Sequence, residues 1–206
     1  SDGAATLAKA LELGARPESG KKALITMTAL KAYADQFDIY TCPGEMGAAI
    51  CAEAGLACTV LGDDNPGQTG PEDTMNAARA MKDRGMDLIL FAGGDGTARN
   101  ILDAVGTDAT VLGIPTGCKI HSGVYALNPR NAALLLGQFA QGKIRETREG
   151  EVMDIDEGLF RQGIVQALLL GLLLVFLFSL STPTGVKPEP QAAAAIFWLA
   201  SAFALV

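Results

Sequence analysis

The segment FAGGDGTARN, Phe91–Asn100, combines small residues, a carboxylate and a hydroxyl at a spacing that suits phosphate chemistry. Gly93, Gly94 and Gly96 allow positive backbone φ angles and a close approach of the main chain to a ligand. The backbone N–H groups of such a loop, together with the N-terminus of a following helix, favour phosphate oxygens. Thr97 can cap that helix or donate to a phosphate. The segment is therefore a candidate phosphate-binding loop.

Asp95 sets this loop apart from a simple anion-binding turn. A carboxylate repels phosphates unless it holds Mg²⁺ or takes a proton from an attacking hydroxyl. A purely structural turn between a strand and a helix remains the alternative, because short glycine motifs also arise without function. The pattern is neither G-x-G-x-x-G nor G-x-x-x-x-G-K-[ST], so it indicates neither the dinucleotide-binding fingerprint nor the P-loop.

Short apolar runs alternate with amphipathic segments on both sides of the loop. The predicted strands are 37–44, 57–64, 86–93, 109–117 and 150–156, and the predicted helices are 45–56, 71–84, 98–106 and 128–143. Residues 23–30 fit either a strand or the start of a helix. This alternation predicts an α/β, Rossmann-like parallel sheet with helices on both faces. In such a sheet, ligands collect beyond the carboxyl ends of the strands, where the glycine loop lies.

Charge and cysteine usage narrow the class of protein. The net charge of −7, from 23 acidic and 16 basic residues, argues against a nucleic-acid surface, which is usually basic. The cysteines form no C-x-x-C pair and have no histidine cluster nearby, so we expect reduced thiols and no zinc site; they are Cys42, Cys51, Cys58 and Cys118. No secretory signal is visible at the N-terminus. Nothing nearby marks His121, the single histidine, as a base or ligand, and we expect a surface or structural role for it.

Two motifs carry a family resemblance. LILFAGGDGTARNI resembles the GGDGT signature of the NAD kinase superfamily, which includes diacylglycerol and sphingosine kinases. GIPTGCKIHSGVYALNP, Gly113–Pro129, is similar to a branch described as predicted ATP- or polyphosphate-dependent NAD kinases. The resemblance covers residues 1–156. It implies transfer of phosphate from ATP or polyphosphate to the ribose 2′-hydroxyl of NAD, with Mg²⁺ assisting and with homo-oligomers possible.

The resemblance also implies roles for individual residues. Asp95 would be the general base that deprotonates the 2′-hydroxyl, while the three loop glycines and Thr97 line the phosphates. A second group would border the nucleotide at the next strand end: Gly113, Thr116 and Gly117. Lys119 would neutralise phosphate, or is a solvated surface lysine. The family pattern also has an opening strand with an Asn-Pro loop and a C-terminal β-rich domain. Both are missing here, so we expect impaired activity.

Residues 164–206 have a different character. Residues 164–181 carry no charge, and a helix of that length spans roughly 27 Å, close to the ~30 Å core of a bilayer. A buried core helix is the alternative, but it needs a larger surrounding protein. We therefore predict transmembrane-type helices at 164–181 and 191–206, after a junction at 157–163. The lysines and arginines that precede the first span place the N-terminal domain in the cytoplasm.

The hydrophobic tail carries a second resemblance. ALLLGLLLVFLFSLS followed by PEPQAAAAIFWLASAF is similar to the N-terminal part of the haem exporter B subunit, the permease of the cytochrome c maturation ABC transporter. This implies haem transporter subunits as partners. Three interpretations follow. The chain is a kinase-like domain with a membrane anchor, a fragment of the permease, or a join of two pieces without function as one molecule.

Overall fold

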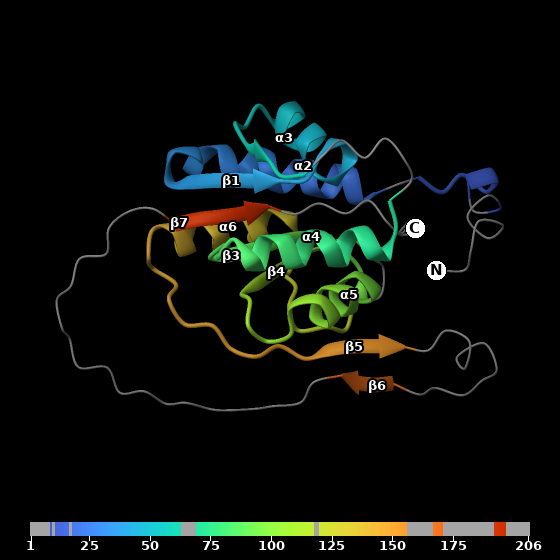
Figure 1. The fold of residues 1–206 in the computed structure, drawn as a ribbon. Coiled ribbons are helices and arrows are strands. Elements are labelled where there is room, and N and C mark those ends of the chain that lie inside the picture. Colours follow the sequence, from blue (N-terminus) through green and yellow to red (C-terminus); the bar gives the residue numbers. More distant parts are fainter. Residues whose placement is uncertain are drawn as a thin grey trace.

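The computed structural model describes residues 9, 11–16, 18–62, 69–117, 120–155, 167–170 and 192–196. Its centre is a five-stranded sheet in the order β2-β1-β7-β3-β4, with every neighbouring pair parallel (Figure 1). The strands are β1 (Phe37–Thr41), β2 (Thr59–Val60), β3 (Leu88–Gly93), β4 (Val111–Pro115) and β7 (Ala192–Ile196). A separate antiparallel pair consists of β5 (Val152–Ile155) and β6 (Ala167–Leu170).

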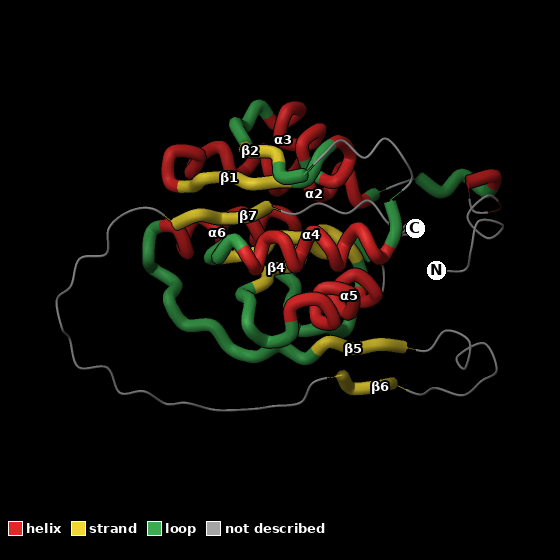
Figure 2. Tube along the Cα trace, viewed as in Figure 1, coloured by secondary structure: helices red, strands yellow, loops and turns green. Residues whose placement is uncertain are grey.

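Helices connect the strands of the larger sheet. The α-helices are α2 (Ser19–Leu30), α3 (Ala48–Ala54), α4 (Pro71–Asp83), α5 (Asp95–Val105) and α6 (Pro129–Ala140), and the short 3₁₀ helices are η1 (Lys31–Gln36) and η2 (Gly44–Met46). Helices α4 and α5 pack side by side (Figure 2), and α2 packs against both α3 and α6.

Local signals in the sequence explain where several helices begin and end. Helices α4 and α6 each start with a proline, whose missing N–H costs nothing at the first helical position. The Asn128 side chain caps α6 by accepting a 2.9 Å hydrogen bond from the backbone N–H of Asn131. Helix α3 ends at Gly55, which has a φ of 66°, a left-handed conformation that favours glycine.

Strand β3 joins the two hydrophobic cores. Leu88, Leu90 and Ala92 belong to the core that α2, α3 and α6 cover, whereas Ile89 and Phe91 belong to the core that α4 and α5 cover. This division follows from the alternation of side chains along a strand. A strand that is covered on both faces needs a continuous apolar sequence, and β3 has one. The predicted α/β architecture is confirmed in these elements.

Several predicted elements differ in extent or type. Residues 23–30, for which strand or helix was open, lie in α2. Within the described part of the predicted strand 57–64, residues 57–62, only Thr59 and Val60 are strand. The helix predicted at 98–106 begins three residues earlier, at Asp95, so part of the glycine loop is itself helical. The strand predicted at 150–156 pairs with β6 and lies outside the main sheet.

The tail contradicts the helix prediction where it is described. Residues 167–170 and 192–196 are strands, not parts of helices at 164–181 and 191–206. The physical reason is backbone pairing: β7 fills the position between β1 and β3, whose facing N–H and C=O groups would otherwise lack partners. The other residues of the two predicted spans lie outside the described ranges. In the part of the chain with assigned structure, no helix has the length and apolar character needed to cross a membrane.

Candidate active site

The two predicted ligand-binding loops lie together at the carboxyl ends of β3 and β4. Gly93 and Pro115 are paired at the last position of these strands, and the N–H of Thr116 donates a 3.1 Å hydrogen bond to the Gly93 carbonyl. The backbones stay close beyond this point, because a Cβ at Gly117 would stand 3.7 Å from the Cα of Gly94. The structure therefore brings the GGDGT loop and the following strand-end loop to one edge of the sheet.

Asp95 is the first residue of α5. Gly94 precedes it in an extended conformation, and its carbonyl accepts hydrogen bonds from the N–H groups of Thr97 (2.9 Å) and Ala98 (3.2 Å). The first turn of a helix carries a partial positive charge, which favours a carboxylate there. Only 14% of the Asp95 side chain is exposed. The carboxylate lies at the mouth of the sheet but is largely shielded from water.

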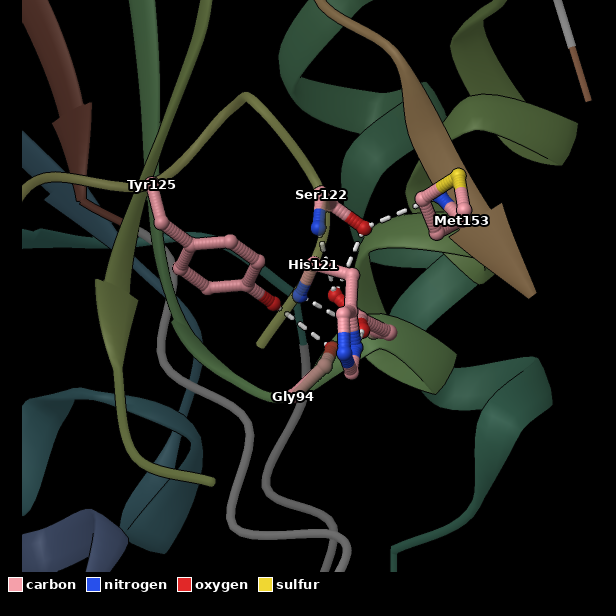
Figure 3. A network of polar contacts seen from close by, with 6 residues as sticks. Gly94, His121, Ser122, Tyr125 and Met153 are labelled. Atoms are coloured by element: carbon pink, nitrogen blue, oxygen red, sulfur yellow. Dashed lines mark hydrogen bonds and ion pairs between the residues drawn. The ribbon is translucent and has the colours of Figure 1, made fainter. Parts of the chain in front are cut away.

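Residues 121 and 122 supply the hydrogen bonds that hold this carboxylate (Figure 3). Asp95 Oδ1 accepts from the Ser122 hydroxyl at 2.6 Å and from the Ser122 N–H at 3.1 Å. Asp95 Oδ2 accepts from the backbone N–H of His121 at 3.0 Å. Three donors from one short segment therefore fix the position of the predicted base. Ser122 lies in the motif Gly113–Pro129, but the sequence predicted no role for it, because its contacts with Asp95 cross 27 positions of the chain.

The ring of His121 also lies beside Asp95. Its Nδ1 is 3.5 Å from Oδ2, and 48% of the side chain is exposed. The exposure agrees with the expected surface histidine. The contact with Asp95 was not predicted, because nothing near His121 in the sequence marks it as a base or ligand. The sequence could not show that the His121 ring lies next to the predicted base in space.

Tyr125 fixes the backbone of the glycine loop from the same segment. Its hydroxyl donates a 2.6 Å hydrogen bond to the carbonyl of Gly94. Its ring meets Phe91 edge to face, with centroids 5.3 Å apart. Burial, and secondarily the negative charge of Asp95, raises the pKa of the Tyr125 hydroxyl. The phenol is therefore a neutral donor throughout the physiological range, and Tyr125 is a second site residue that the sequence pattern missed.

The glycines of the first loop serve purposes other than the one expected. None of Gly93, Gly94 and Gly96 adopts a positive φ, so backbone freedom is not the reason for them. Gly93 is required by packing, because a Cβ there would overlap the buried side chain of Thr97. Gly94 and Gly96 instead border open space, with no atom within 4 Å of an added Cβ. Only these two present bare backbone for a ligand to approach.

Two residues of the second predicted group, Gly113 and Thr116, are also buried. Gly113 is buried, and a Cβ there would overlap the ring of Tyr125, so the residue makes room for that ring. Thr116 is also buried, and its hydroxyl accepts a 3.2 Å hydrogen bond from Ser19. Lys22, from the first turn of α2, donates to the Thr116 carbonyl at 3.4 Å and brings a positive charge to this edge. Lys119 lies outside the described residues.

The described residues do not form a protein-built site for Mg²⁺. This ion takes oxygen ligands in near-octahedral geometry. Across the described ranges, no group of three or more His, Cys, Asp or Glu side chains could hold a metal ion.

Comparison with known proteins gives one match. The family model of the ATP-NAD kinase N-terminal domain matches residues 18–144, more than half of the chain. This range includes β1 to β4, α2 to α6 and both strand-end loops. No curated protein and no solved structure matches the chain, and none of these comparisons supports the resemblance of the tail to a haem exporter. Through residues 18–144, the chain belongs to the ATP-NAD kinase family.

Proposed function

We propose that this protein phosphorylates the ribose 2′-hydroxyl of NAD, with ATP or polyphosphate as the phosphate donor and Asp95 as the general base. Membership of the ATP-NAD kinase family supports the substrate class. The observation that carries the chemical assignment is the position of Asp95, a shielded carboxylate at the carboxyl ends of β3 and β4.

The reaction needs a group that takes one proton. Asp95 accepts the proton of the 2′-hydroxyl as the hydroxyl oxygen attacks the terminal phosphorus of the donor. A new phosphorus–oxygen bond forms, and the bond from that phosphorus to its bridging oxygen breaks. The donor leaves as ADP or as a polyphosphate shortened by one unit. A positioned base of this kind contributes about 10²- to 10⁴-fold in rate.

Phosphate binding falls to the backbone around Asp95. Gly94 and Gly96 leave open space at the start of α5, where N–H groups and the helix dipole favour anions. Lys22 adds a cation at the neighbouring strand end. Phosphoryl transfer depends mainly on positioning and on neutralising charge, and these groups supply both. The buried residues Gly93, Gly113 and Thr116 support the loops from behind.

The test is formation of NADP by the purified full chain, measured separately with ATP and with polyphosphate. Asp95→Asn keeps the shape of the side chain but removes the base, and we expect kcat to fall by about 10²- to 10⁴-fold. Asp103→Asn is the matched control, because Asp103 is an exposed aspartate of the same helix. An Asp95→Asn variant that retains more than half of the wild-type kcat would refute the assignment of the base.

A further inference from the structure

The segment between β4 and α6 does more than connect these two elements, because it also contacts the glycine loop. Residues 120–126 fold back over the start of α5, so that residues 121, 122 and 125 all contact the glycine loop (Figure 3). The segment is itself hydrogen-bonded to β4 and to the residue that precedes β5. Val124 and Ala126 bond to the backbone of Gly113, and the N–H of Gly123 donates to the Glu151 carbonyl at 2.7 Å.

The two oxygens of Asp95 are not equivalent in this arrangement. Oδ1 accepts two hydrogen bonds, both from Ser122. Oδ2 accepts one, from the His121 N–H. An ionised carboxylate offers about four acceptor positions, two on each oxygen. Oδ1 is therefore filled by the protein. The His121 Nδ1 stands 3.5 Å from Oδ2 without a hydrogen bond to it, so Oδ2 keeps a lone pair for a proton from outside.

The direction of the Ser122 hydroxyl is also fixed. Its oxygen accepts a 3.1 Å hydrogen bond from the backbone N–H of Met153, at the second position of β5. With that side of the oxygen occupied, the hydroxyl hydrogen points to Asp95 Oδ1 at 2.6 Å. Ser122 is 6% exposed, so water cannot easily replace it. A serine that connects a strand backbone to a carboxylate in this way sets the orientation of that carboxylate.

We propose that Ser122 is a positioning residue for phosphoryl transfer: it holds Oδ1 of Asp95 and thereby leaves Oδ2 as the oxygen that takes the substrate proton. The proposal rests on the function proposed above for its kinetic consequence, but the contact itself can be tested without substrate. Among the side chains that the structure describes, His121 and Tyr125 are titratable groups that face Asp95, both from the same segment. From β5, the backbone N–H of Met153 bonds to the Ser122 hydroxyl.

Ser122→Ala removes the hydroxyl and keeps the backbone N–H. We expect kcat for NAD phosphorylation to fall about tenfold or more while KM for NAD stays within about twofold, because the base is misoriented and the binding surface is intact. Thr26→Val is the matched control. It also removes a buried hydroxyl, but one that donates to the Pro129 carbonyl at 2.8 Å, away from Asp95.

A second measurement records the ¹³C NMR chemical shift of the Asp95 carboxyl carbon in the full chain at one neutral pH. The Ser122 hydroxyl bonds directly to Oδ1, so its loss should shift the Asp95 carboxyl signal. Thr26→Val should leave that signal where it is. A role of Ser122 in overall stability alone would lower the melting temperature without moving the signal.

The outcomes separate the two proposals. If the wild-type chain forms no NADP with either donor, the proposed function fails, whereas a changed ¹³C signal of Asp95 in Ser122→Ala still establishes the hold on Oδ1. If the wild-type chain is active and Ser122→Ala has an unchanged kcat, the positioning role is refuted. An unchanged ¹³C signal of Asp95 refutes it as well, whatever the activity.

Discussion

The loop after β3 and the loop after β4 meet at the same edge of the sheet, but they contribute different groups to it. The first supplies the carboxylate and the bare backbone of Gly94 and Gly96. The second supplies the donors and the ring that fix them, through Ser122 and Tyr125. The GGDGT loop thus depends for its geometry on residues of the second motif for which the sequence predicted no role. A candidate active site should be defined by both sides of such a contact.

Among the variants that distinguish the two loops, we expect Gly113→Ala to have the largest effect on the free energy of unfolding. The added Cβ would overlap the Tyr125 ring and push the second loop away from the first. Overpacking of this kind costs about 1–3 kcal/mol, and we expect the free energy of unfolding in urea to fall by that amount. Gly96→Ala, in the open part of the first loop, is the control and should not destabilise the fold. Equal losses in both variants would show that the loops do not differ in this way.

Tyr125→Phe tests a single contact between the loops. Losing the hydrogen bond to the Gly94 carbonyl should lower the free energy of unfolding by about 1 kcal/mol near pH 8. Burial raises the pKa of this hydroxyl in the folded chain. The associated stability is therefore fully present below pH ~10, the ordinary value for tyrosine, and is lost as pH rises above it.

The check is the difference in unfolding free energy between wild type and Tyr125→Phe, followed from pH 8 to pH 11. We expect this difference to decrease above pH ~10. Cys42 and Cys51, whose pKa values burial raises to about 11 and about 12, titrate in both proteins and cancel in the comparison. A difference that grows with pH would contradict a buried neutral phenol.

The smallest effect is expected from His121→Ala. The donor to Asp95 Oδ2 is the backbone N–H, which the substitution keeps, and the ring is half exposed at 3.5 Å. Exposed ion pairs contribute little, so we expect kcat to change by at most about fivefold. Steady-state kinetics on NAD decide the point. A loss as large as that of Asp95→Asn would mean that the ring itself takes part in the chemistry.

Local patterns were enough to predict much of the sheet and its helices. The predicted helix starts at residues 71 and 128 lie at or next to the prolines that begin α4 and α6, and the apolar run of β3 indicated a strand covered on both faces. The loop pattern identified Asp95, because a carboxylate among glycines is chemically unusual. It could not show the roles of Ser122 and Tyr125, whose contacts join positions 27 and 31 residues apart. Their place inside the second motif, Gly113–Pro129, was the available hint.

The tail shows the limit of composition as a guide. A long apolar segment satisfies the requirement for a membrane helix, but it equally suits a buried strand when a sheet has facing edges to pair with. For residues 192–196 the pairing with β1 and β3 decided the outcome, and it depends on elements far away in the sequence.

The central place of β7 has a consequence for synthesis and folding. Ile39 and Ala194 are neighbours in the sheet although 155 positions separate them. Contacts between such distant positions close large loops and slow folding. During translation, β1 and β3 leave the ribosome well before β7, the strand that pairs with both of them. The sheet is completed only when residues 192–196 have emerged.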